Sequence, residues 1–113
     1  MIKKEKRLRK KKDIDNVFKN GKSFYSGLLG VKILKNNLEF NRYCVVISAN
    51  ISKKASERNK IKRRIKAVIL EEEPFLKSGF DCLIIAKKEI SLADFFFINS
   101  EVKKTFKKIS LYS

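Results

Sequence analysis

The segment SERNKIKRRIK, residues 56–66, constrains the fold most, because six of its eleven residues are basic and it continues directly into the apolar residues AVIL. At 100° per residue, a helix over residues 57–72 gathers four apolar side chains on one side: Ile61, Ile65, Val68 and Ile69. The basic side chains begin directly beside this stripe. The segment therefore predicts a helix with one face in a core and a cationic surface left free.

A shorter helix is predicted in DIDNVFKNGK, where Ile14, Val17 and Phe18 share one face. Asp13 is expected to cap its start, and Gly21 to end it in the left-handed conformation. A last helix follows Ser91 and Asp94, which have the spacing of a capping box. Its apolar stripe is expected to contain Phe95, Ile98, Val102, Phe106 and Ile109, with Phe95–Phe97 packed in the core.

Alternating or apolar runs predict the strands. In residues 28–34, Leu29, Val31 and Ile33 form an apolar face, while Lys32 lies on the opposite face, open to solvent or a ligand. Residues 42–48 and 80–88 are apolar on both faces and are expected to be buried strands. If residues 22–27 pair as a first hairpin strand, the order is α-β-β-β-α-β-α within a single domain, residues 1–113.

Net charge identifies the class of partner. The chain has 28 Lys and Arg against 12 Asp and Glu, a formal net charge of +16. A polyanion is the natural complement, either nucleic acid or an anionic membrane surface. Glu57 is the only acid in residues 53–66, which favours phosphate binding over a merely solvated helix. Residues 1–12 are expected to form a solvated, partly disordered basic arm. No apolar run is long enough to span a bilayer, and no secretory signal is expected.

The residue types present argue against catalysis by the protein itself. The chain has no histidine, which removes histidine-based acid–base chemistry and histidine zinc sites. Cys44 and Cys82 are expected to be buried thiols, as in a reducing cytosol. A protein nuclease would need clustered carboxylates for metal ions. The only acidic cluster, Glu71–Glu73, is expected to be a solvated helix end, so no catalytic or metal-binding residue is predicted.

The motif RNKIKRRIK, from Arg58 to Lys66, resembles the hallmark of the protein subunit of bacterial ribonuclease P, with Lys60 where arginine is usual. The basic arm and helix RLRKKKDIDNVFKNGK and the strands CVVIS and DCLIIAKK extend the resemblance over nearly the whole chain. It implies an α+β two-layer sandwich with a four-stranded mixed sheet and a left-handed β-α-β crossover. General topology rules alone would predict a right-handed crossover.

The resemblance also implies a function. In that family the RNA subunit removes the 5′ leader of precursor tRNA, with magnesium acting through the RNA, and the protein binds the catalytic RNA and the leader in a cytoplasmic complex. The implied RNA-binding residues are Arg58, Asn59, Lys60, Lys62, Arg63 and Lys66. The implied leader cleft contains Ile14, Phe18 and Lys32, and the implied basic arm contains Arg7, Arg9, Lys10, Lys11 and Lys12. Another basic RNA-binding protein, such as a ribosomal protein, fits the same composition.

Overall fold

Four strands form one mixed sheet in the computed structural model, which describes residues 2–92 and 94–113. The spatial order is β1-β2-β4-β3, with β2 antiparallel to β1 and β4, and β3 parallel to β4. The strands are β1 (Lys22–Tyr25), β2 (Leu29–Lys35), β3 (Arg42–Val46) and β4 (Phe80–Ala86). The hairpin strand predicted around residues 22–27 is therefore present, and β3 lies at one edge of the sheet.

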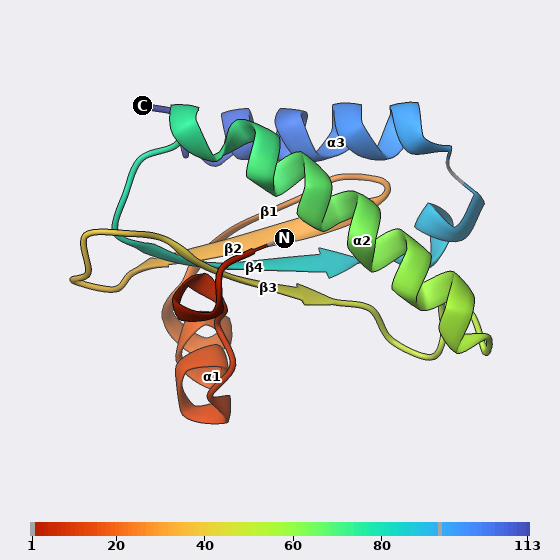
Figure 1. Ribbon diagram of the computed structural model, residues 1–113, viewed down its shortest axis with the longest axis horizontal. Coiled ribbons are helices and arrows are strands. Elements are labelled where there is room, and N and C mark those ends of the chain that lie inside the picture. The colour runs from red at the N-terminus through yellow and green to blue at the C-terminus, as the bar shows by residue number, and fades with distance from the viewer. Residues whose placement is uncertain (1, 93) are drawn as a thin grey trace.

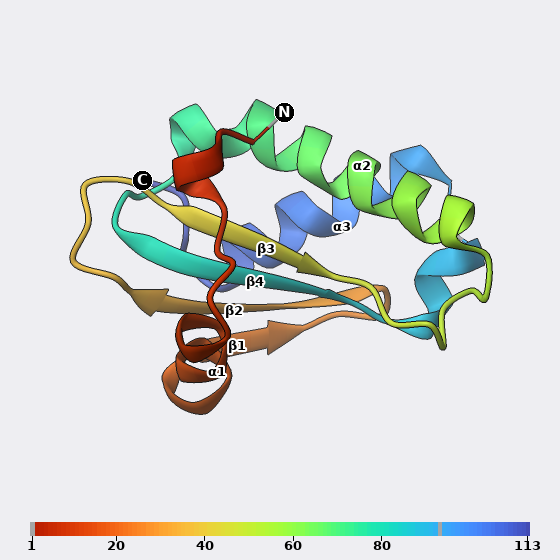
Figure 2. The same ribbon diagram turned by 60° about the horizontal axis from the view of Figure 1, so that its bottom comes forward.

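Two long helices cover one face of this sheet. They are α2 (Ala55–Glu72) and α3 (Phe95–Lys108), whereas α1 (Lys11–Asn20) crosses the opposite face (Figure 1). Short 3₁₀ helices occupy Lys4–Lys6, Glu73–Phe75 and Lys88–Leu92. Figure 2 shows the sheet from the side of α1, with α2 behind it, β3 and β4 both pointing right and β4 below β3. With these strands turned to point up, the chain moves rightward from β3 to β4 through a helix behind the sheet. The crossover is left-handed, as the resemblance implies.

Alternation along the strands separates two apolar cores. Leu29, Val31 and Ile33 of β2 point toward α2 and α3, together with Cys82 and Ile84 of β4. The opposite face has a smaller cluster of Leu8, Val17 and Leu83 under α1. Ile65, Val68 and Ile69 of α2 are fully buried, which confirms the predicted stripe, while Ile61 is half-buried at its margin.

The start and end of α1 differ from the prediction. The helix begins at Lys11, and Lys10 occupies the N-cap position with no side-chain cap. Asp13 lies in the first turn and contacts Arg42, 3.4 Å away, instead of capping. Gly21 is extended (φ −76°, ψ 149°). It is needed for space, because a Cβ there would lie 2.5 Å from the carbonyl oxygen of Val17.

The N-terminal arm is docked on the sheet, so the expectation of a partly disordered arm is wrong for residues 2–12, although its basic side chains other than Lys6 are exposed as expected. Its apolar residues Ile2 and Leu8 are buried. The Leu8 amide donates to the Tyr43 carbonyl at 2.8 Å, and Lys6 forms an ion pair with Glu73. The arm thereby covers the free edge of β3, a usual way to protect an edge strand.

The first turn of α3 is the other departure. Asp94 caps the helix by accepting from the Phe97 amide at 3.0 Å, whereas Ser91 belongs to the preceding 3₁₀ helix. Ile98, Val102, Phe106 and Ile109 are buried as predicted, but Phe95, Phe96 and Phe97 are exposed. In Figure 1 this first turn extends past the ends of the strands, so no sheet lies beneath it.

Candidate nucleic-acid interface

A groove of about 330 Å³ opens where the N-terminal arm, α1, β3 and α2 meet. Its apolar lining includes Leu8 from the arm, Ile14 from α1 and Cys44 from β3. Its cationic lining comes from two elements that are far apart in the sequence: Arg7 and Arg9 of the arm, and Lys62 and Lys66 of α2. None of the described residues that line it is acidic. The groove therefore offers four positive charges above an apolar floor.

These charges are crowded in a partly desolvated place. Burial lowers the pKa of Lys66, and the positive charges of Lys62 and Arg7 lower it further. A cation whose neighbours and surroundings disfavour its charge gains most from an anion placed beside it. The electrostatics of the groove therefore favour the binding of a phosphate group.

Cys44 belongs to the floor of this groove. Cys82 is fully buried as predicted, but Cys44 is only half-buried, because its side chain points to the face that α1 covers incompletely. Burial raises the pKa of the Cys44 thiol, and this outweighs the opposite influence of Lys62 and Lys66. The thiol therefore stays protonated and contributes an apolar contact.

The cleft residues implied on α1 lie one turn apart. Ile14 lines the groove, whereas Phe18 lies farther along the helix, with 43% of its surface exposed. The Lys32 ammonium lies 5.5 Å from the centre of the Phe18 ring and donates to the Phe18 carbonyl at 3.1 Å. Phe18 and Lys32 form a pair beside the groove, and Ile14 connects that pair to it.

Tyr25 is a surface aromatic that the sequence reading missed. Tyr25 of β1 pairs with Gly30 of β2. Because Gly30 and Lys32 are two residues apart in β2, they lie on the same face of the sheet, so Tyr25 is on the face that carries α1 and Phe18. Its ring lies directly on Gly30, where an added Cβ would come within 2.2 Å of the ring. The alternation in KSFY, with Phe24 inward and Tyr25 outward, is the signal that could have revealed it.

The basic motif of α2 is divided between two sides of the helix. Lys62 and Lys66 face the groove, while Lys60 and Arg63 line a separate hollow together with Arg64. Arg58 is half-buried and donates to the Ser52 carbonyl at 2.6 Å, so it anchors the loop that precedes α2. Asn59 is exposed on the helix surface. The six RNA-binding residues implied by the motif therefore do not form a single surface.

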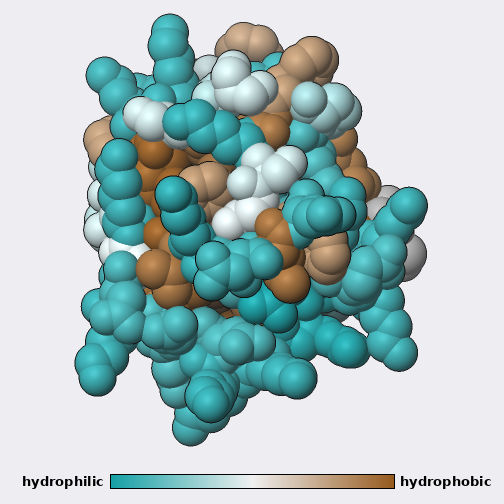
Figure 3. All heavy atoms as spheres, turned by 90° about the vertical axis from the view of Figure 1, so that its left-hand side faces the viewer, coloured by the Kyte–Doolittle hydropathy of each residue, from teal (hydrophilic) through white to brown (hydrophobic). Residues whose placement is uncertain are grey.

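The remaining cations of the arm cluster at the start of α1. Lys10, Lys11 and Lys12 are all exposed there. Positive charge at a helix N-terminus opposes the helix dipole and slightly destabilises the helix. Figure 3 shows hydrophilic side chains over the lower part of the molecule, where α1 lies. Such a placement favours binding of an anion over stability of the free protein.

Two of the three acidic side chains at the end of α2 are engaged in contacts, so the expectation of a solvated cluster is wrong for Glu72 and Glu73, whereas Glu71 is exposed as predicted. Glu72 accepts from the Tyr112 hydroxyl at 2.7 Å, and Glu73 pairs with Lys6 of the arm. Within residues 2–92 and 94–113, no group of three or more His, Cys, Asp or Glu side chains is arranged to hold a metal ion. These acids join the arm and the C-terminus to α2.

Comparison with known proteins gives a consistent result. A family model described as Ribonuclease P matches residues 2–110. The ribonuclease P protein component of Clostridium botulinum is 33% identical over 111 residues, which cover 97% of this chain and 99% of that protein. This chain belongs to the ribonuclease P protein family. The Thermotoga maritima protein component is 30% identical over 107 residues, covering 91% of each chain.

Solved ribonuclease P proteins have the same architecture. The Thermotoga maritima protein, in complex with 1-(4-fluorophenyl)-2-thiourea, superposes with a TM-score of 0.84 at 29% identity, covering 90% of this chain and 98% of that one. The Staphylococcus aureus protein gives a TM-score of 0.90 at 21% identity, covering 96% and 98%, and supports the fold alone. The fold expected for a ribonuclease P protein is confirmed. In the described part of the chain, no helix has the length and apolar character to cross a membrane.

Proposed function

We propose that this protein is the RNA-binding subunit of a ribonuclease P complex and that it holds both the catalytic RNA and the 5′ leader of precursor tRNA. The observation that carries the proposal is the groove, in which four cations from the arm and α2 meet with no acidic residue among the described lining. Four phosphates bound at these cations would give the salt-sensitive affinity typical of nucleic-acid binding.

A single-stranded leader suits the surroundings of this groove. Proteins that bind single strands combine a cationic path for the backbone with exposed aromatic side chains for the bases. Here the cationic path lies between the arm and α2, and Phe18 and Tyr25 are exposed on the same side of the sheet. We infer that the leader follows the sheet face beside α1, with its phosphates at Lys62 and Lys66 and a base against Phe18.

The cleavage chemistry is assigned to the RNA subunit, with magnesium bound through that RNA. The sequence has no histidine, and Glu72 and Glu73 are already engaged by Tyr112 and Lys6. The protein's contribution is to offset repulsion between the phosphates of two RNA molecules. Because divalent ions offset the same repulsion, the protein should matter most when magnesium is scarce. We place this complex in the cytoplasm.

Leader removal from precursor tRNA tests the proposal. The RNA subunit is assayed over a series of magnesium concentrations, with and without the protein. We expect strong stimulation at low magnesium that shrinks as magnesium rises, and no cleavage by the protein alone. Substituting Lys62→Ala together with Lys66→Ala should reduce the stimulation.

Lys107→Ala together with Lys108→Ala is the matched control, because it removes the same charge from exposed positions at the end of α3. It should keep most of the stimulation. Equal loss in both double variants would show that net charge matters and the groove does not. Metal-dependent cleavage by the RNA-free protein, abolished by substituting Glu71–Glu73, would overturn the assignment of the chemistry to RNA.

A further inference from the structure

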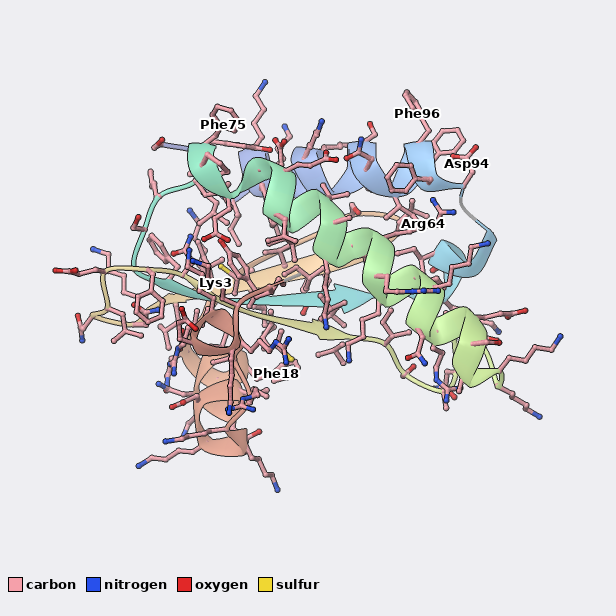
Figure 4. All side chains as sticks on the ribbon, viewed as in Figure 1. Lys3, Phe18, Arg64, Phe75, Asp94 and Phe96 are labelled. Atoms are coloured by element: carbon pink, nitrogen blue, oxygen red, sulfur yellow. The ribbon has the colours of Figure 1, made fainter. Side chains whose placement is uncertain are left out.

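The first turn of α3 presents three consecutive phenylalanines to solvent. Phe96 is 73% exposed and Phe97 is 58% exposed, and their rings meet edge to face with centroids 6.1 Å apart. Phe95 lies under the guanidinium of Arg64, which is 4.7 Å from the centre of its ring. Figure 4 shows Arg64 of α2 and Phe96 of α3 at the same end of the molecule. Exposed aromatic residues this concentrated indicate a binding surface.

The neighbouring charges identify what this surface attracts. Lys60, Arg63 and Arg64 of α2 line a hollow of about 350 Å³ with Ala67 and Phe95, and none of the described residues lining it is acidic. Asp94, the acid nearest in sequence, is engaged as the cap of α3. We name this region the aromatic–cationic surface, formed by Lys60, Arg63, Arg64, Phe95, Phe96 and Phe97.

Charge and continuity favour RNA over another protein copy as its occupant. A second copy of this chain would bring two surfaces of the same positive charge together, which opposes association. An RNA supplies phosphates for the cations and flat bases for the rings. The surface also lies on the opposite flank of α2 from Lys62 and Lys66, so a long RNA that fills the groove can continue around the same helix.

We propose that the aromatic–cationic surface is a second RNA-binding site, separate from the groove, at which unpaired bases stack on Phe96 and Phe97 while Lys60, Arg63 and Arg64 hold the flanking phosphates. This inference rests on the proposed RNA-binding function. It assigns RNA contact to the start of α3, which lies on the sheet face opposite α1. It also gives Lys60 and Arg63 a role different from that of Lys62 and Lys66.

Tryptophan fluorescence tests the site, because the chain contains no tryptophan. A Phe96→Trp variant carries the only indole at the surface, and a base stacked on it quenches its emission. The matched control is Phe75→Trp, since Phe75 is 62% exposed and lies at the opposite end of α2 (Figure 4). The probe is an unstructured, end-labelled oligouridylate of about 12 nucleotides, within the length that single-strand binding sites occupy.

We expect saturable quenching in the Phe96→Trp protein and little in the Phe75→Trp protein, although both bind the probe by anisotropy. Adding Arg64→Ala to Phe96→Trp should weaken the quenching isotherm. In the otherwise natural chain, Phe96→Ala together with Phe97→Ala should lower affinity for the probe about tenfold, within the range of one stacked base. Phe75→Ala should leave the affinity unchanged.

The outcomes separate this inference from the proposed function. Probe binding without selective quenching in the Phe96→Trp protein would overturn the second site and leave the groove intact. Absence of any RNA binding would overturn both. A blue shift of the Phe96→Trp emission that depends on protein concentration without RNA would assign the surface to self-association. The same shift with anionic vesicles but not with the probe would assign it to a membrane.

Discussion

Lys32 fixes the position of Phe18 on the surface. Its ammonium contacts the Phe18 ring and donates to the carbonyl of the same residue. A cation over an exposed ring contributes about 0.5–1 kcal/mol. Phe18 is therefore held in the open and not packed in the core, and one face of its ring is covered by a cation. This arrangement leaves an oriented aromatic side chain available to a nucleotide base.

Substituting Phe18→Ala should weaken binding of precursor tRNA to the reconstituted complex by about 1–3 kcal/mol, the value of one base–aromatic stack. Binding of mature tRNA, which lacks the leader, should be unchanged. The measurement is the Kd of the two RNAs for the same enzyme preparation. Phe75→Ala serves as the control, because it removes an exposed ring (62% exposed, against 43% for Phe18) that is remote from α1. Equal weakening for both RNAs would show that Phe18 does not contact the leader.

Some residue contacts had no signal in the sequence. Arg42 makes two hydrogen bonds to the buried carboxylate of Asp81, at 2.8 and 2.7 Å, and also contacts Asp13. The hydrogen bond with Asp81 is the main cause of the raised pKa of Arg42. Asp81 is the single charged residue of the otherwise apolar strand β4. Its partner became apparent only when the parallel register placed Arg42 opposite Asp81.

At the scale of elements, the N-terminal arm behaves as part of the sheet. Leu8 is 2% exposed and packs with Val17 and Leu83, while its amide donates to the edge strand β3. Sequence composition gave no sign of this, because eight basic residues dominate residues 3–12. The single apolar residue among them determines where the arm lies.

Leu8→Ala should lower the free energy of unfolding by about 2–4 kcal/mol, since it removes a buried side chain from the apolar cluster with Val17 and Leu83. Leu38→Ala, at an exposed loop position, should change it by no more than about 0.5 kcal/mol. Urea titrations of the two variants measure the difference. A Leu8→Ala protein as stable as the Leu38→Ala protein would show that the arm is not docked in solution.

The helices show where periodicity predicts well and where it does not. Ile65, Val68 and Ile69 were assigned correctly because α2 lies over the sheet for most of its length. The same periodic rule placed Phe95–Phe97 in the core, although helical periodicity alone does not show where the sheet beneath a helix ends. The three phenylalanines that were wrongly placed in the core are those of the aromatic–cationic surface. Large apolar side chains suit a core and a binding surface equally, so the residue types alone do not distinguish the two.

At the scale of the whole molecule, the net charge of +16 should make RNA binding strongly dependent on salt. If about five Lys and Arg side chains contact phosphate, the slope of log affinity against log salt should be about −3.5 to −4.5. Lys62→Ala together with Lys66→Ala should reduce its magnitude by about 1.4–1.8. Filter binding of precursor tRNA, whose leader we place at Lys62 and Lys66, to the protein over a salt series measures it. A slope near zero would contradict phosphate-dominated binding.

Residue patterns predicted one part of the fold, and the resemblance predicted another. Element order and the buried faces of β2 and α2 followed from residue patterns, since they depend on local periodicity. The handedness of the crossover did not, because the general rule favours the opposite hand. Only the resemblance carried by RNKIKRRIK and its flanking strands gave the correct hand. No local pattern encodes the packing of α2 and α3 on the same face.

The docked arm has a consequence for the energetics of RNA recognition. Ordering a flexible chain costs about 1–2 kcal/mol per residue in backbone conformational entropy. If the nine residues 2–10 became ordered only on contact with RNA, that cost would be subtracted from the affinity. Here Leu8 and the Lys6–Glu73 pair hold the arm in place in the free protein. The entropy cost of ordering the arm is therefore part of the free energy of folding and not of RNA binding. RNA binds to a groove that is already preorganised.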